Sequence, residues 1–336
     1  MGRKAVAALI GLLAVVAPLA EAQASPKRVV LGVGGKTAVV YLPLTVVERL
    51  GYFKEEGLDV VIQDLQAGSR ALQALIGGSV EVVMGFYDHT IQMQAQGRDI
   101  VAFVQVGRYP AIVLGVRADL ADQVKGVADL KGRKVGVTAP GSSTHFFLNY
   151  LLVKNGLKPT DVSVIGVSVG AQAVAAVQNR QVDAISNVEP AITLLEERGL
   201  LKVLADSRST RGTREVLGGE YPAAVLYTTR AWLEKNPETA QRLVNAMVRG
   251  LRWMQGKTPE EIAAVLPEEY FLGDRALYLK VLRNSLESFS PTGRFSDTAP
   301  LRPLTVLSAF DPNVARARID LKRTYTNEFV DRVPKR

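Results

Sequence analysis

The chain has 336 residues, of which 47% are hydrophobic and 7% aromatic, and its formal net charge is +8. This length leaves room for two lobes with separate cores, and the composition is that of a folded α/β protein rather than a disordered one. The basic residues are scattered and form no run interleaved with aromatic residues, which argues against nucleic-acid binding. The absence of cysteine excludes disulfides, thiol catalysis, thiolate metal sites and a lipid-modified N-terminal cysteine.

Residues 1–24 have the pattern of a cleaved export signal. Arg3 and Lys4 form a charged start, an apolar stretch follows, and small residues up to Ala24 supply a cleavage site. The alternative is an uncleaved membrane anchor, but the apolar run is short for a membrane span. We therefore expect a mature protein that begins at Ser25 and lies free in the periplasm.

The first part of the chain predicts strands that alternate with helices. Strands are expected at 28–34, 58–62, 80–84 and 100–106, and helices at 42–50, 70–76 and 90–96. Such alternation is typical of a largely parallel sheet.

The same order of elements recurs later in the chain. A strand at 133–138, a helix at 143–155 and a strand at 162–167 repeat the opening pattern. An offset of 102 residues places Gly68 on Gly170 and the acidic Glu81 on Asp183. We therefore predict two similar α/β lobes.

The connections between these lobes predict a hinge. Residues 107–113 are interpreted as the passage into the second lobe, and residues 206–222 as the return. A strand at 222–229 then rejoins the first lobe, and the rest of the chain is mainly helical. The predicted division places residues 25–112 and 220–336 in lobe I and residues 113–219 in lobe II. Two crossings of this kind predict closure of the lobes on a ligand.

The stretch from Lys131 to Gly156 combines a strand, a turn and the start of a helix. Ala139-Pro140-Gly141 breaks the strand, and Ser142, Ser143 and Thr144 offer hydroxyls that can cap the helix. Backbone N–H groups and hydroxyls that meet at one point suit an anion or the polar head of a small ligand. The alternative is an ordinary connection whose serines only cap the helix. Because the carboxyl ends of strands carry ligand-facing loops, the expected cleft is lined by residues 36–41, 68–70, 86–89, 141–145, 170–171 and 187–190.

The motifs of common catalytic and cofactor sites are incomplete in this chain. Gly34-Gly35-Lys36-Thr37 follows a strand, but Val30 stands where a phosphate-binding P-loop requires glycine, and Thr37 stands where a dinucleotide fingerprint does. His89 and His145 have no second ligand at metal-binding spacing. No serine lies in a Gly-x-Ser-x-Gly elbow. We expect no catalytic residue, no cofactor and no metal.

The remaining candidates have the composition of a binding site. Lys36, Arg70 and Arg108 could pair with a carboxylate or sulfonate, although each could equally be a solvated surface charge. Aromatic side chains could form an apolar wall or pack in the core. These are Tyr41, Phe86, Tyr87, Tyr109, Phe146 and Tyr221. Asp88 and Glu189 are candidate hydrogen-bond acceptors, and Asp183 is expected to be structural.

Several short motifs together resemble a known family. They are Tyr41-Leu42-Pro43, Gly51-Tyr52-Phe53, Gly57-Leu58-Asp59-Val60, Gly68-Ser69, Asp129-Leu130-Lys131-Gly132, the run from Gly136 to His145, Val182-Asp183-Ala184 and Glu189-Pro190. Over about residues 28–255 the chain resembles the nitrate/sulfonate/taurine family of ABC-transporter substrate-binding proteins, whose fold group includes thiamine-pyrimidine synthase-like proteins. The resemblance implies a type II periplasmic-binding-protein fold that delivers one small molecule to a membrane permease driven by a cytoplasmic ATPase.

The residues and the resemblance together give the predicted ligand-binding set. It consists of Lys36, Thr37, Tyr41, Ser69, Arg70, Tyr87, Asp88, Arg108, Ser142, Ser143, Thr144, Asn187, Glu189 and Tyr221. The leading hypothesis is a monomeric, non-enzymatic transport receptor for a small organic anion, either a sulfonate or a carboxylate. One alternative is a binding protein or enzyme that acts on a pyrimidine precursor. Another is a binding module that serves a membrane sensor.

Overall fold

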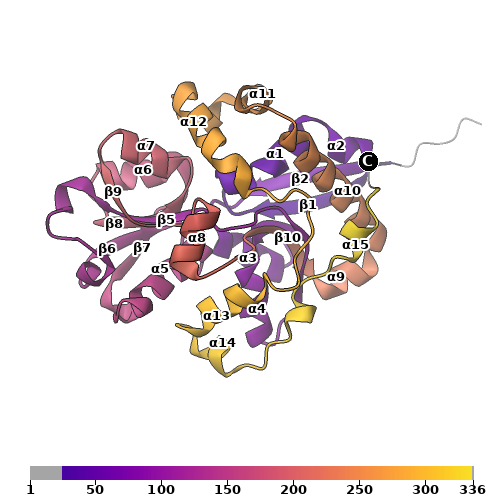
Figure 1. Ribbon diagram of the computed structural model, residues 1–336. Coiled ribbons are helices and arrows are strands. Elements are labelled where there is room, and N and C mark those ends of the chain that lie inside the picture. Colours follow the sequence, from indigo (N-terminus) through magenta and orange to yellow (C-terminus); the bar gives the residue numbers. More distant parts are fainter. Residues whose placement is uncertain (1–24, 335–336) are drawn as a thin grey trace, which may run out of the picture.

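The computed structural model describes residues 25–334, so the predicted export signal lies outside the described residues. Two lobes stand side by side, each built on a five-stranded sheet (Figure 1). Lobe I contains β1 (Lys27–Val33), β2 (Leu58–Asp64), β3 (Val82–Phe86), β4 (Ile100–Gln105) and β10 (Ala224–Thr229). Lobe II contains β5 (Ile112–Arg117), β6 (Lys134–Val137), β7 (Ser163–Gly166), β8 (Ala184–Val188) and β9 (Leu201–Asp206). The predicted two-lobed α/β fold is confirmed.

Helices cover the faces of both sheets. Lobe I carries α1 (Leu42–Arg49), α2 (Tyr52–Glu55), α3 (Gly68–Ile76) and α4 (Asp88–Ala95). Lobe II carries α5 (Ser143–Lys154), α6 (Gly170–Gln178), α7 (Ala191–Glu197) and α8 (Thr210–Leu217). The C-terminal part adds α9 (Arg230–Lys235), α10 (Pro237–Gln255), α11 (Pro259–Ala263), α12 (Arg275–Ser285), α13 (Leu301–Ser308), α14 (Pro312–Arg316) and α15 (Glu328–Asp331). Of these, α10 packs on α1 and α2, whereas α12 reaches α7 of lobe II.

The two sheets repeat one arrangement. Their strand orders are β2-β1-β3-β10-β4 and β7-β6-β8-β5-β9, and in each the fourth strand runs antiparallel to its neighbours. The predicted offset of 102 residues carries both bounds of α3 onto those of α6, and both bounds of β3 onto those of β8.

One acidic side chain in each lobe makes a corresponding hydrogen bond to a strand of its sheet. Glu81 accepts a hydrogen bond from the backbone N–H of Val30 at 2.9 Å, and Asp183 accepts the matching bond from Lys134 at 2.9 Å. Each carboxylate therefore holds the backbone of a strand in its own lobe, β1 at Val30 and β6 at Lys134. The structural role that the sequence predicts for Asp183 follows from this bond.

The chain passes between the sheets at residues 106–111 and 207–223, and a third segment lies against the first passage. Phe289 forms a bridge with Gly107, and the Ser290 N–H donates to the Val106 carbonyl at 2.7 Å. No local pattern in the sequence predicts this third segment. The exact lobe limits, 112/113 and 219/220, stay a proposal.

Helix α8 lies in the return passage, where the sequence predictions include no helix. Its start is capped by the Ser209 hydroxyl, which accepts from the Gly212 N–H at 3.0 Å, and it ends at Gly218 with φ 86°. A serine cap and a C-terminal glycine are standard helix boundary signals, and their spacing here was overlooked.

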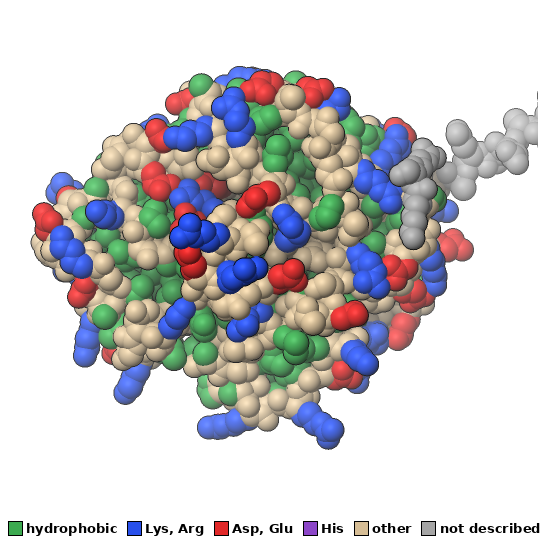
Figure 2. All heavy atoms as spheres, in the orientation of Figure 1, with side chains coloured by type: hydrophobic (Ala, Val, Ile, Leu, Met, Phe, Trp, Pro, Cys, Tyr) green, Lys and Arg blue, Asp and Glu red, His purple; other side chains and the backbone are tan. Residues whose placement is uncertain are grey.

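The surface is charged in both signs. On the face seen in Figure 2, lysine and arginine side chains are interspersed with aspartate and glutamate across both lobes. This face of the described residues therefore offers no single basic field for a nucleic acid. Within residues 25–334, no helix is both long enough and apolar enough to span a membrane.

Candidate ligand-binding cleft

A small cavity lies between the lobes, where the carboxyl ends of their parallel strands face each other. Its lining comes from loops of both lobes, and among residues 25–334 no charged side chain is part of that lining. The lining residues are Gly34, Ala38, Val40, Tyr41, Gly68, Phe86, Thr138, Ser142, Ser143, Thr144, Val169 and Val188. About 20 Å³ is free for the centres of water molecules, so a larger molecule requires the lobes to separate.

The starts of two helices meet across this cavity. The N–H of Ser69, in the first turn of α3, donates to the Ser142 hydroxyl at 3.0 Å, and the two hydroxyls lie 3.1 Å apart. Gly34 permits this approach, because a Cβ there would lie 2.9 Å from the Cα of Gly68. The first N–H groups of a helix have no partner within it and carry partial positive charge. The cleft therefore gathers neutral hydrogen-bond donors from α3 and α5.

Asp88 connects the two lobes from beside the cavity. It is 1% exposed, and it accepts hydrogen bonds from the Ser143 hydroxyl at 2.7 Å and the Tyr221 hydroxyl at 3.0 Å. Burial raises the pKa of Asp88, whereas His89 and these two hydrogen bonds act against that shift. Burial also raises the pKa of Tyr221, so its hydroxyl keeps its proton and donates at neutral pH.

Both histidines contact the same glycine. His89 Nε2 lies 3.3 Å from the Gly141 carbonyl oxygen, across the cleft, and the Gly141 N–H donates to His145 Nδ1 at 3.0 Å. The described residues contain no group of three or more potential ligands that could hold a metal ion. The histidines thus position the loop before α5.

Glu189 belongs to a second contact between the lobes. Its carbonyl accepts from the Val39 N–H at 3.0 Å, and its side chain accepts from Thr193 and from Arg208. Arg208 also pairs with Asp206 and Glu196, both at 2.7 Å. The sequence analysis did not single out Arg208, because an arginine in a passage between lobes has no local pattern that marks it as buried.

Comparison with known proteins shows which family this chain belongs to. A family model described as NMT1/THI5 like matches residues 39–262, which is more than half of the chain. The chain belongs to the NMT1/THI5-like family. The predicted resemblance is confirmed.

Individual relatives agree with this assignment. A putative aliphatic sulfonates-binding protein of Escherichia coli (strain K12) is 31% identical over 230 residues, which cover 68% of this chain and 67% of the relative. A solved structure from Bordetella bronchiseptica RB50 is 46% identical with a TM-score of 0.88, covering 91% of this chain and 96% of that one. The alkanesulfonate-binding protein SsuA from Xanthomonas axonopodis pv. citri, bound to MOPS, has a TM-score of 0.68 at 21% identity, covering 90% and 99%. This last likeness shows the fold alone. The relatives do not favour the pyrimidine alternative.

In this NMT1/THI5-like protein, several predicted ligand-binding residues lie at the cavity or beside it. Tyr41 and Phe86 line it and meet edge to face, with ring centroids 6.0 Å apart. Thr37 lies at the contact between the lobes, because a Cβ on Gly170 would be 3.2 Å from its hydroxyl. Asn187, which precedes the lining residue Val188, is buried and donates to the Ser168 carbonyl at 2.9 Å.

Other predicted residues lie elsewhere. Lys36 pairs with Glu48 at 2.7 Å, Arg70 is exposed, and Arg108 donates to the Glu287 carbonyl. Tyr87 points into the core of lobe I, where its hydroxyl bonds to Thr324. The described conformation thus brings no basic side chain of the predicted set into the cavity lining.

The histidine contacts predict a dependence of stability on pH. Burial lowers the pKa of His145 below its ordinary value of 6.5. Below that pH the unfolded state binds more protons than the folded state, so this histidine's contribution to the free energy of unfolding falls as the pH falls. We expect the Tm advantage of the wild type over His145→Gln to shrink between pH 7.5 and pH 5.

The comparison between the wild type and His145→Gln also cancels the opposing pH dependence that Asp88 contributes. The raised pKa of Asp88 acts in the other direction, since its proton favours the folded state above pH 3.8. Asp88 is present in both proteins, so its effect cancels in the difference between their Tm values. A Tm difference between the wild type and His145→Gln that stays constant from pH 7.5 to pH 5 would contradict the lowered pKa of His145.

Proposed function

We propose that this protein is the substrate-binding component of an ABC importer and takes a small organic anion, a sulfonate or a carboxylate, into the inter-lobe cleft. It delivers this anion to a permease in the inner membrane that a cytoplasmic ATPase drives. It acts as a monomer in the periplasm after removal of residues 1–24, and it catalyses no reaction. The names of its relatives, one of them a putative aliphatic sulfonates-binding protein, support this class of ligand.

The observation that carries the proposal is the convergence of the α3 and α5 starts on one cavity. Ser69 and Ser142, one from each helix start, are already in hydrogen-bond contact there. Helix N-termini favour anions through their free N–H groups and their dipole. An anion therefore has donors from both lobes and stabilises the closed arrangement. The rings of Tyr41 and Phe86 supply a wall for the apolar part of the ligand.

A thermal-shift panel tests this proposal. The mature protein from Ser25, refolded to remove any co-purified ligand, is heated with alkyl sulfonates, aromatic carboxylates, nitrate or aminopyrimidines. A ligand at a hundred times its Kd adds about 2.7 kcal/mol to the free energy of unfolding. We expect a selective rise in Tm with a sulfonate or carboxylate. A rise with aminopyrimidines alone would overturn the proposal.

A further inference from the structure

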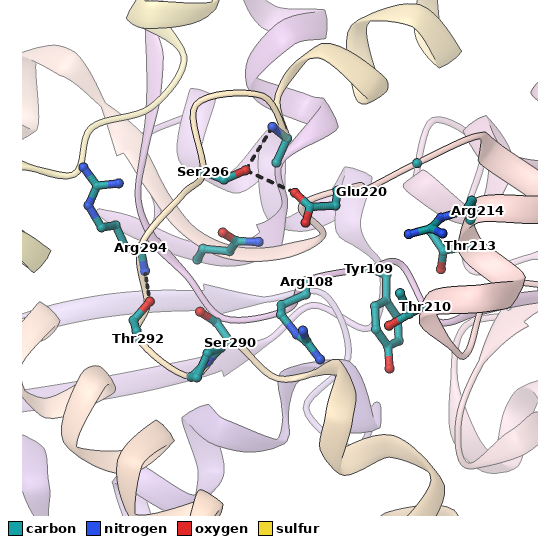
Figure 3. A pocket seen from close by; sticks show the side chains of 14 residues that line it. Arg108, Tyr109, Thr210, Thr213, Arg214, Glu220, Ser290, Thr292, Arg294 and Ser296 are labelled. Carbon is teal, nitrogen blue, oxygen red and sulfur yellow. Dashed lines mark hydrogen bonds between the residues drawn. The ribbon is translucent and has the colours of Figure 1, made fainter.

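A second cavity lies at the hinge, outside the cleft (Figure 3). About 250 Å³ is free there for the centres of water molecules, compared with 20 Å³ in the cleft. Three separate pieces of chain line it: the first passage, helix α8 with the return passage, and the segment that follows Ser288. Within the described part of the chain, this cavity and the cleft cavity have no lining residue in common.

The side chains of this hinge cavity carry a positive balance. Arg108, Arg214 and Arg294 line it together with one carboxylate, Glu220. Arg294 pairs with Asp331 at 2.9 Å, so its charge is compensated. Among the described lining residues, Arg108 and Arg214 remain as two guanidinium groups against the carboxylate of Glu220, while the carboxylate of Glu287 lies outside the lining at the hydroxyl of Tyr109.

Within residues 25–334, Arg108 and Arg214 each have N–H donors without an acceptor. Arg108 directs its Nε and Nη2 at the carbonyl of Glu287, a neutral acceptor, which leaves Nη1 without a bond to a group of residues 25–334. Arg214 has no ion-pair partner in that part of the chain, whereas Arg211, one turn earlier on α8, pairs with Glu215 at 2.7 Å. In Figure 3 the side chains of Arg108 and Arg214 flank the ring of Tyr109.

We propose that the hinge cavity binds a small organic carboxylate. The planar fork of a guanidinium matches a carboxylate with two parallel hydrogen bonds, and here two such groups come from different elements. The buried ring of Tyr109 and the side chain of Pro291 provide an apolar surface for the body of the ligand. The hydroxyl of Tyr109 is engaged with Glu287 at 2.8 Å, so the ring is held in place.

The lining of this cavity includes residues that are attached to each of the two lobes. Helix α8 packs on β9 of lobe II, whereas Gln105, another lining residue, ends β4 of lobe I. A carboxylate between Arg214 and Arg108 joins the moving α8 to the passage beside it. A ligand that favours one lobe arrangement shifts the equilibrium towards it, and the cleft ligand in turn changes the affinity of the hinge cavity.

Calorimetric titration with benzoate tests the proposal on the mature protein. Benzamide serves as the uncharged probe of the same shape. We compare the wild type with Arg214→Gln, and use Arg211→Gln as the matched control, because it removes the same charge from the same helix outside the cavity. We expect benzoate but not benzamide to bind the wild type, and Arg214→Gln to weaken benzoate by about tenfold or more.

The remaining outcomes decide against the proposal. Equal benzoate affinity in Arg214→Gln and the wild type would place benzoate elsewhere, and equal losses in both variants would indicate a general charge effect. The absence of benzoate binding up to millimolar concentrations would also overturn it. The Tm response of Arg214→Gln to the sulfonates of the panel reports on the cleft separately, so failure at one site is distinguishable from failure at the other.

Discussion

Replacement of Arg208 by alanine is expected to lower the free energy of unfolding by about 3 kcal/mol or more. The Arg208 side chain is 22% exposed and is held by Glu189, Glu196 and Asp206 at 2.7–2.8 Å. Its removal leaves these carboxylates close together without a cation, and Glu189 is only 5% exposed. The loss of an ion-pair partner costs most when the remaining charge is buried. Urea denaturation followed by circular dichroism measures the change.

Two further variants serve as controls for the expected loss of stability in Arg208→Ala. Arg208→Lys keeps the charge but cannot reproduce the fork that reaches three carboxylates, so we expect an intermediate loss. Arg211→Ala removes an exposed pair with Glu215 and is expected to change the urea midpoint very little. An Arg208→Ala protein as stable as Arg211→Ala would show that the carboxylates around residue 208 need no cation.

Replacement of Asp88 by alanine is expected to destabilise the protein by about 2–4 kcal/mol and to open the lobes. The change leaves the hydroxyls of Ser143 and Tyr221 without their acceptor in a buried place. Relief from burying a carboxyl group offsets part of this cost, in keeping with the raised pKa of Asp88. Because Ser143 belongs to lobe II, small-angle scattering should report a larger radius of gyration alongside the lower urea midpoint.

The controls for Asp88 separate its two bonds. Asp88→Asn keeps an oxygen acceptor in the same volume, so its loss should be smaller. Ser143→Ala removes only the bond between the lobes and leaves the bond from Tyr221 in place. We expect Ser143→Ala to open the lobes with little loss of core stability. If the scattering curves of Asp88→Ala and Ser143→Ala both match that of the wild type, the hydrogen bond between Asp88 and Ser143 does not hold the lobes together.

The fold was predictable because its signals are local and repeated. Helix α10 falls in the part of the chain that is predicted to be mainly helical, and the offset between α3 and α6 is visible in the spacing of glycines and alanines. Loops at strand ends also follow from topology alone. For this reason Tyr41, Phe86, Ser142 and Thr144 could be assigned to the cleft before the structure was known.

What could not be predicted depends on tertiary neighbours. Lys36 lies in a cleft loop, but Glu48, on the following helix, turns back to pair with it. Tyr87 and Asp88 are adjacent in sequence, yet at the start of α4 one points into the core and the other towards Ser143. Helix α8 carries local signals of a helix, but neither it nor the segment around Ser290 carries a local signal for the neighbours with which it lines the hinge cavity.

The most direct test of the central claim is a crystal structure of the protein with the anion that raises Tm most in the panel. The account predicts ligand density between the lobes, in contact with Phe86 and with the starts of α3 and α5 at Ser69 and Ser142. Additional density at Arg108 and Arg214 is compatible with that result. Density confined to the hinge cavity or to the outer surface, with the Ser69–Ser142 contact undisturbed, would contradict it.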